Sequence, residues 1–197
     1  VIQTREGCVY HMTCRGSRFA DGAKRNPNGE VFMKNRETDE WLAQNERSTR
    51  NFIRKWGQMV EHDEYLKPII SPKYSIGFEL TEACDINTIR QLEPWCSYMV
   101  IPDSELIERY IEEEQPNTDY VLSDKLHTDI PNNPIYDIRV VFNPLEMTQS
   151  SFSIITQLSK IIKDSGSEGD RFELDVFDIW IAQMVEQQRN NIVCNSN

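Results

Sequence analysis

The chain has 197 residues, of which 39% are hydrophobic and 27% are charged. This length is enough for one ordinary domain or two small ones, and the aromatic content is too high for a largely disordered chain. The formal net charge of −11 argues against nucleic acid or an anionic membrane as the main partner of the whole chain.

The first predicted elements are short. Residues 8–12 alternate as in a strand, and residues 15–36 are rich in Gly, Asn, Arg and Lys, which predicts a loop. Trp41 and Leu42 are predicted to lie on a short helix after Asp39.

A second helix is predicted to begin near Ser48 or Thr49, either of which can cap it, and Gly57 either ends or kinks it. Its apolar positions have helical spacing: Phe52, Ile53, Trp56, Met59 and Val60. The opposite face is basic: Arg50, Arg54 and Lys55.

Pro68 and Pro72 mark a predicted break between two parts of the chain, residues 1–66 and 67–197. The charge balance changes near the same place. Residues 1–60 hold 11 Lys/Arg against 7 Asp/Glu, a net of +4, whereas residues 61–197 hold 10 against 25, a net of −15.

Four strands are predicted in the second part. Residues 74–81 and 136–142 alternate as in half-buried strands, and residues 98–101 are continuously apolar, as in a strand covered on both faces. Residues 171–181 form the last strand, in which the alternation changes phase after Val176 and so predicts a bulge or bend.

Three helices are predicted between these strands. Their capping residues are Asp85, then Asp103 or Ser104, then Thr148. Residues 116–134 are predicted to be irregular, and the run Glu112-Glu113-Glu114 is predicted to face water at the end of the second of these helices. This order implies an α/β or α+β layered domain with a mixed sheet and helices on at least one face.

No apolar run is long enough to span a bilayer, and no secretory signal is visible. Because the chain begins with Val, we expect it to be processed, trimmed or part of a longer protein. The five cysteines are odd in number and lack CxxC spacing, so we expect reduced thiols in the cytoplasm.

The segment from His11 to Arg18 contains the densest group of candidate binding residues. Neutral imidazole is a good metal ligand, and the planar guanidinium group of Arg matches phosphate. His11 with Arg15, Gly16, Ser17 and Arg18 could therefore hold a metal and a diphosphate. The simpler interpretation is a hydrogen-bonded histidine followed by solvated arginines.

This segment, together with Phe52, Lys55, Trp56 and Gly57, resembles the C-terminal end of the catalytic domain in family 2 glycosyltransferases of large DNA phages and other viruses. The resemblance covers residues 1–66. It implies an open, Rossmann-like GT-A fold, a nucleotide-sugar donor, Mn²⁺ or Mg²⁺, His11 as a metal ligand, and a diphosphate or loop-closing role for Arg15 and Arg18.

The sequence also departs from that family. The family binds its metal chiefly through Asp-x-Asp, and this chain contains no Asp-x-Asp. The resemblance therefore implies that the donor-binding half precedes Val1, and that residues 67–197 form an acidic accessory domain for oligomerisation or for docking a glycan or other acceptor.

Two other functions are compatible with the sequence. Residues 67–197 could form a non-enzymatic protein-interaction module, since their alternation of strands and helices is complete without the first part. Alternatively, a basic surface could bind nucleic acid; its residues would be Arg15, Arg18, Lys24, Arg25, Arg50, Arg54 and Lys55.

Isolated groups elsewhere carry weaker chemical signals. His62-Asp63-Glu64 is more typical of a charged surface than of a metal site, because consecutive helical residues point in different directions. His127 is predicted to be a solvated loop residue. Trp41 and Trp56 are more typical of a core than of a stacking platform, and Cys14 lacks an evident base.

Overall fold

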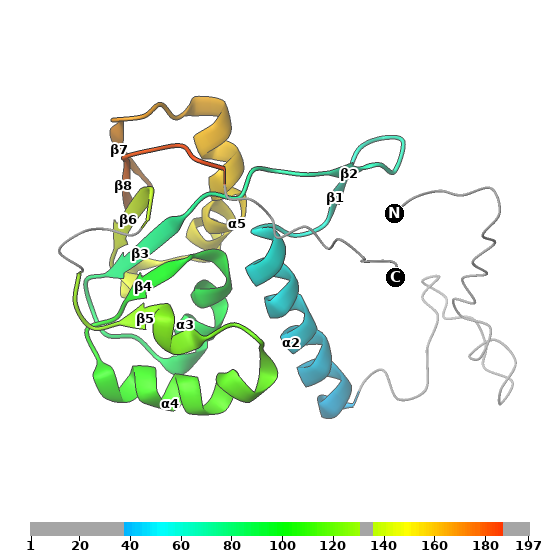
Figure 1. The fold of residues 1–197 in the computed structure, drawn as a ribbon, viewed down its shortest axis with the longest axis vertical. Coiled ribbons are helices and arrows are strands. Elements are labelled where there is room, and N and C mark those ends of the chain that lie inside the picture. The colour runs from blue at the N-terminus through cyan, green and yellow to red at the C-terminus, as the bar shows by residue number, and fades with distance from the viewer. Residues whose placement is uncertain (1–37, 131–135, 187–197) are drawn as a thin grey trace, which may run out of the picture. The chain divides into compact units, whose positions relative to one another are not determined.

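The computed structural model, which describes residues 38–130 and 136–186, contains a mixed six-stranded sheet (Figure 1). The strands follow the order β5-β4-β3-β6-β8-β7 across the sheet. Their bounds are β3 (Ile76–Leu80), β4 (Tyr98–Val100), β5 (Leu126–His127), β6 (Ile138–Phe142), β7 (Arg171–Leu174) and β8 (Phe177–Ile181). Strands β3, β4, β5 and β6 run parallel to one another, and β8 is antiparallel to both β6 and β7. The predicted α/β class with a mixed sheet is confirmed.

Helices α3 (Ile86–Leu92), α4 (Ser104–Glu114) and α5 (Gln149–Ser165) connect these strands. The side chains of Asp85 and Asp103 accept hydrogen bonds from the first turns of α3 and α4. Thr148 forms a capping box with Ser151 at the start of α5, and Gly166 ends that helix. The predicted caps are therefore confirmed, because each depends only on residues that are close in sequence.

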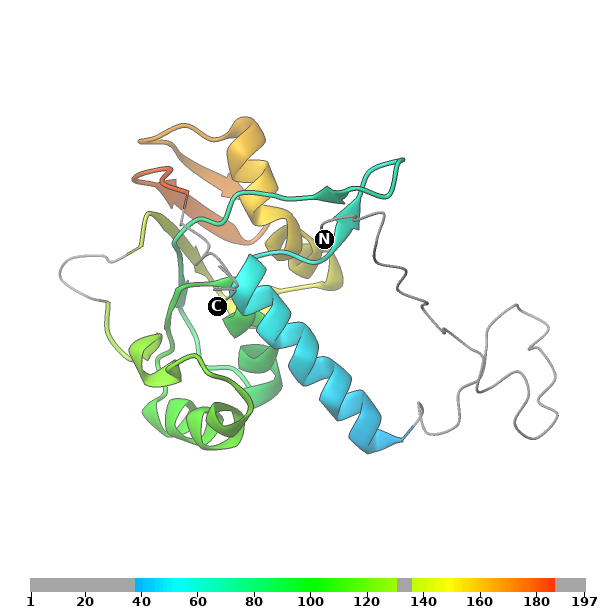
Figure 2. The same ribbon diagram turned by 45° about the vertical axis from the view of Figure 1, so that its right-hand side comes forward.

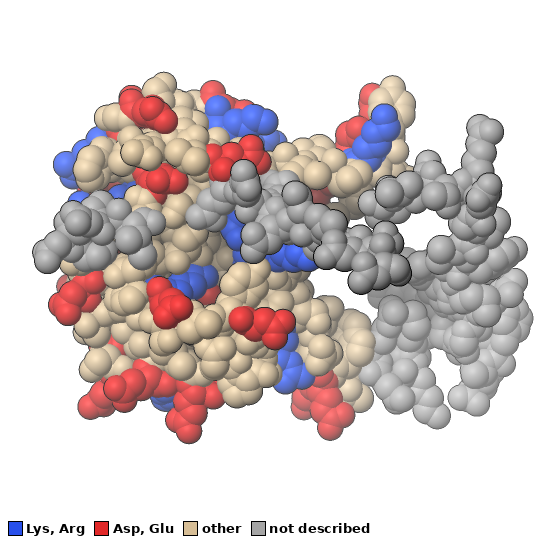
Figure 3. Space-filling view, in the orientation of Figure 1, with Lys and Arg blue, Asp and Glu red and all other residues tan. Residues whose placement is uncertain are grey.

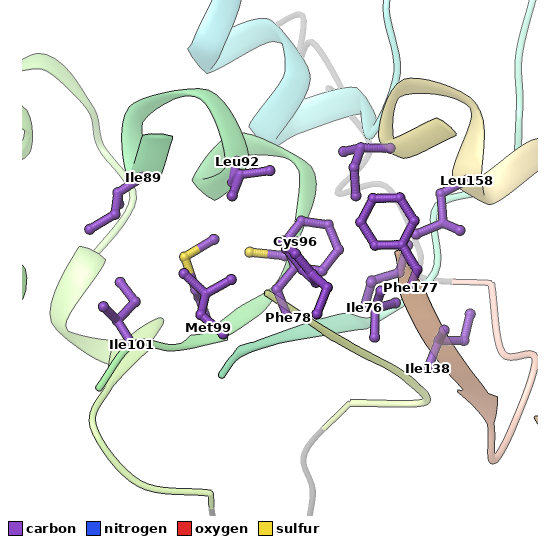
Figure 4. Close-up of a cluster of buried hydrophobic side chains, with 14 of the residues drawn as sticks. Ile76, Phe78, Ile89, Leu92, Cys96, Met99, Ile101, Ile138, Leu158 and Phe177 are labelled. Atoms are coloured by element: carbon purple, nitrogen blue, oxygen red, sulfur yellow. The ribbon is translucent and has the colours of Figure 1, made fainter. Parts of the chain in front are cut away.

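The hydrophobic core lies between one face of the sheet and the three helices. Phe78, Met99 and Ile138 on the sheet contact a layer that includes Leu92 and Leu158 from the helices (Figure 4). The opposite face is different in character, since its only buried apolar cluster among the described residues contains Tyr98, Val100 and Tyr136. We call this opposite side of the sheet the open face.

Three predicted strands differ from the structure. All five residues of β3 are buried, so it is a central strand and is not half-buried. Residues 171–181 form two antiparallel strands, because Asp175 adopts a positive φ of 56° and turns the chain. The region predicted to be irregular contains β5, whose two residues are too few to show any periodicity.

Helix α2 (Asp39–Trp56) is continuous where two helices were predicted. Gly57 ends it with a φ of +71° and donates its backbone N–H to the carbonyl of Ile53 at 2.7 Å. Met59 and Val60 lie beyond this end and are exposed, so their predicted place on the apolar face of the helix is wrong.

The chain divides into two compact units, Val1–Glu46 and Arg47–Asn197, and the boundary between them falls within α2. The first is described only from residue 38, where Thr38 Oγ1 accepts a hydrogen bond from the backbone of Trp41. The second contains the sheet and the remaining helices. It therefore includes the residues Phe52 to Gly57, which the sequence grouped with the N-terminal part.

A short hairpin follows α2, with strands β1 (Glu61–His62) and β2 (Pro68–Ile69), and extends away from the sheet (Figure 2). The side chain of Gln58 fastens its base by contacting the backbone of Ile69 and Ser71. The apolar side chains that it exposes are Met59, Val60, Tyr65, Leu66, Ile69 and Ile70. We call residues 58–71 the apolar hairpin.

Candidate functional site

The predicted metal and diphosphate ligands lie outside the described residues: His11, Arg15, Gly16, Ser17 and Arg18. The other residues that carry the resemblance are on the last turn of α2. The rings of Phe52 and Trp56 are 6.2 Å apart, and the ammonium of Lys55 lies 5.4 Å from the Trp56 ring.

A network of buried charges fastens α2 to the part of the chain that carries the six-stranded sheet and helices α3, α4 and α5, residues 72–130 and 136–186, which we call the sheet domain. Arg54 donates to Glu93 at 2.6 Å and to Glu114 at 2.8 Å, and these two carboxylates are buried. Arg50 holds Glu114 through two bonds of 2.8 Å, and Lys125 contacts Glu93 at 2.6 Å. We call these five residues the buried charge network.

The surroundings of Glu93 and Arg54 favour the charged form of each group. Burial alone would raise the pKa of Glu93, but the charges of Lys125 and Arg54 lower it to about 2. Burial would likewise lower the pKa of Arg54, yet its bonds to Glu93 raise it. Tyr110 donates its hydroxyl to Glu93 at 3.0 Å, and burial raises the pKa of that hydroxyl. Because both carboxylates are held by strong donors, the network is suited to structural anchoring rather than to proton transfer.

This network corrects two predictions. Arg50 and Arg54 do not form an outward basic face, since both contribute to ion pairs with the sheet domain. Glu114, predicted to face water, is 2% exposed. The nucleic-acid interpretation therefore loses two of its predicted contact residues.

Four alternating charges cross the open face of the sheet. Glu79 on β3 accepts hydrogen bonds from the hydroxyl of Tyr136 and, at 2.7 Å, from Nε of Arg139 on β6. Arg171 on β7 holds Asp178 on β8 through bonds of 3.1 and 2.6 Å. The bonds and charge of Arg171 lower the pKa of Asp178, and those of Glu79 raise the pKa of Arg139.

Trp180 on β8 lies in register between the two arginines. It pairs with Arg139 on one side and with Arg171 on the other, so all three share the open face. Trp180 is 42% exposed. We call Glu79, Arg139, Asp178, Arg171 and Trp180 the open-face cluster; of these, only Glu79 is buried.

The open-face cluster was not predicted from the sequence, although a signal for it was present. Arg139 lies between two buried apolar residues of β6, and Asp178 and Trp180 alternate with buried residues of β8. Period-2 alternation assigns all three to an outward face. It does not indicate that β6 and β8 are neighbours, which follows from the sheet order.

The carboxyl ends of the parallel strands form a different, acidic edge. Glu82 and Asp85 follow β3, Asp103 follows β4, and Asp129 follows β5. Figure 3 shows further acidic side chains gathered over α4. An edge of this charge does not suit a phosphate group, although nucleotides commonly bind at this end of open α/β sheets.

Two histidines, His62 and His127, lie in the part of the chain that the structure describes. His127 belongs to β5 and is half-buried, with its ring stacked 4.2 Å from that of Tyr98, so its prediction as a solvated loop residue is wrong. His62 is exposed on β1.

Within residues 38–130 and 136–186, no three His, Cys, Asp or Glu side chains are grouped to hold a metal ion. The same residues contain no helix that is both long and apolar enough to span a membrane.

Comparison with known proteins assigns the chain to no family. The chain matches no family model, no curated protein and no solved structure. The resemblance to glycosyltransferases therefore stays a prediction from the residues that carry it.

Proposed function

We propose that the chain is the C-terminal part of a nucleotide-sugar-dependent glycosyltransferase, and that its sheet domain is a non-catalytic docking domain for the acceptor or a partner. The observation that supports a physical link between the two parts is the buried charge network. It fastens α2, which carries Phe52, Lys55, Trp56 and Gly57, directly to the sheet domain. A transferase segment that ends in this helix would carry the docking domain in a fixed orientation to that helix.

The proposal assigns the chemistry to residues outside the described part. His11 ligates Mn²⁺ or Mg²⁺, and Arg15, Gly16, Ser17 and Arg18 bind or close over the diphosphate of the donor. The nucleotide-binding half and the Asp-x-Asp motif precede Val1, and the enzyme works in the cytoplasm. In this arrangement the sheet domain provides no reacting group.

The test uses the intact gene product. We expect release of nucleoside diphosphate from a panel of nucleotide sugars, dependent on Mn²⁺ or Mg²⁺, and strongly reduced by His11→Ala. His62→Ala is the matched control, because His62 is exposed on the apolar hairpin and should leave the rate unchanged. A gene that starts within a few residues of Val1, or metal affinity unchanged by His11→Ala, would contradict the proposal.

The apolar hairpin supports a second candidate, a non-enzymatic protein-interaction module. Its tip exposes 73% of Tyr65 and 81% of Leu66, and Leu66 has a positive φ of 60° that a bulky residue rarely adopts. Exposed apolar groups on an ordered ribbon are typical of contact surfaces. Sedimentation of the full chain and of Tyr65→Ser/Leu66→Ser tests self-association: a wild-type monomer at high concentration would exclude an oligomer formed by this hairpin.

A further inference from the structure

We infer that the open-face cluster is a binding site for a neutral oligosaccharide, which gives the docking domain a specific ligand class. The role of that oligosaccharide as acceptor rests on the proposed function. The site itself rests on three observations: the placement of Trp180, the fixed arginines beside it, and the charge balance of the cluster.

The first observation is an aromatic surface on a rigid support. Trp180 is on β8, which pairs with a strand on each side, and the residue is 42% exposed. The neighbouring residues of β8, Ile179 and Ile181, are completely buried and hold the strand in place. The axial C–H groups on a face of a sugar ring form an apolar patch, and such a patch can pack against the face of an exposed indole.

The second observation is that both neighbouring guanidinium groups are already oriented. Each is planar, carries five N–H donors, and directs two of them at one carboxylate: Arg139 at Glu79 and Arg171 at Asp178. Side chains fixed in this way lose little entropy when a ligand binds. The Arg171–Asp178 pair, which is the more exposed of the two, presents donors and acceptors side by side. Neighbouring sugar hydroxyls, which both donate and accept, match that arrangement.

The third observation concerns the net charge of the cluster. Its two arginines and two carboxylates sum to zero. Glu173, which pairs in register with Asp178, adds one more carboxylate to the same face, and the whole chain has a net charge of −11. A phosphate or nucleic acid would meet a carboxylate beside each arginine and a repulsive field from the rest of the chain. A neutral ligand rich in hydroxyl groups avoids both effects.

The exposure of the charged groups shows where the ligand would lie. Relative side-chain exposure is 72% at Arg171, 34% at Asp178, 36% at Arg139 and 4% at Glu79. A sugar stacked on Trp180 would therefore contact the Arg171–Asp178 pair most directly. Glu79, which is buried, would hold Arg139 in position without contacting the sugar itself.

The experiment is a titration of the full 197-residue chain with maltotetraose, cellotetraose and chitotetraose, followed by the indole N–H signals of its four tryptophans in NMR. We expect one oligosaccharide to shift the signal that is missing in Trp180→Phe. Trp180→Ala should weaken binding by about tenfold or more, as for a central aromatic contact, and Arg171→Ala by about fivefold, as for a lost hydrogen bond. Trp41→Ala is the matched control, since Trp41 is also exposed, and should bind as the wild type does.

The outcomes separate this inference from the proposed function. Absence of a Trp180 shift with every oligosaccharide at 20 mM, or an equal shift with inorganic phosphate, would overturn the oligosaccharide site. Binding that Arg171→Ala and Trp180→Ala leave unchanged would also overturn it. If the chain binds sugar through Trp180 but the intact gene product does not turn over nucleotide sugars, the site stands and the glycosyltransferase proposal fails.

Discussion

Replacing Glu93 with glutamine removes one negative charge from the buried charge network and leaves its shape nearly unchanged. Glu93 is completely buried, so Arg54 and Lys125 would lose a counter-charge that water cannot replace. Glu114 would still hold Arg54 at 2.8 Å, which keeps the helix attached in the variant.

The size of the effect follows from the pKa of Glu93, because a glutamine resembles a protonated glutamate. This pKa is lowered from its ordinary value of 4.5 to about 2. Each unit corresponds to about 1.4 kcal/mol, so the charged form stabilises the folded chain by about 3 kcal/mol. Since the folded pKa is the lower one, this stabilisation is complete above pH 4.5 and is lost as the pH falls toward 2.

Urea unfolding followed by circular dichroism measures this directly. At pH 7 we expect Glu93→Gln to lower the free energy of unfolding by about 3 kcal/mol and the melting temperature by about 6–12 °C. The difference from wild type should narrow below pH 4.5, because only the wild type then gains a proton at this position. Glu108→Gln, on the exposed face of α4, is the matched control and should change stability by less than about 0.5 kcal/mol. A difference below about 1 kcal/mol at pH 7, or one that does not vary with pH, would refute the reasoning.

Three further predictions concern local structure. Gly77→Ala places a Cβ 2.5 Å from the Tyr136 ring and should lower the free energy of unfolding, measured by thermal denaturation, by about 1–3 kcal/mol. A variant as stable as the wild type would show that the ring moves aside. Gly57→Ala should lower the free energy of unfolding by about 1 kcal/mol, because Gly57 has a φ of +71°, and Gly57→Asn should lower it by less. An alanine variant as stable as the wild type would contradict this prediction. Burial raises the pKa of Cys84 to about 11 and of Cys96 to about 12, so both should resist iodoacetamide at pH 8 until the chain is unfolded; peptide mass spectrometry that finds them modified in the folded chain would disprove the prediction.

Local signals in the sequence predicted most of the sheet domain. Asp85, Asp103 and Thr148 were recognised as helix caps because a cap needs only the next three residues. The two-residue strands escaped prediction because period-2 alternation needs about four residues to become visible. The turn at Asp175 was missed because Asp-Val is not a typical hairpin turn sequence.

The functional features depended on contacts between distant residues. Arg54 meets Glu93 across 39 positions of sequence and Glu114 across 60, and nothing local distinguishes a buried arginine from a solvated one on an amphipathic helix. The open-face cluster likewise requires β8 to lie between β6 and β7. The predicted roles of His11 and Arg15 to Arg18 remain predictions, because those residues lie outside the described chain.

The separation between Arg54 and its partners also affects how the protein is made. Helix α2 leaves the ribosome before any of the carboxylates that will hold it. At the usual speed of synthesis, about 5–20 residues per second, the 60 residues between Arg54 and Glu114 take several seconds to appear. During that interval the helix cannot take its final position, and its arginines stay hydrated. Nascent chains arrested before Glu93 has emerged should therefore be cleaved by trypsin at Arg50 and Arg54, whereas chains arrested after Ile181 has emerged, when the sheet can be complete, should be protected there.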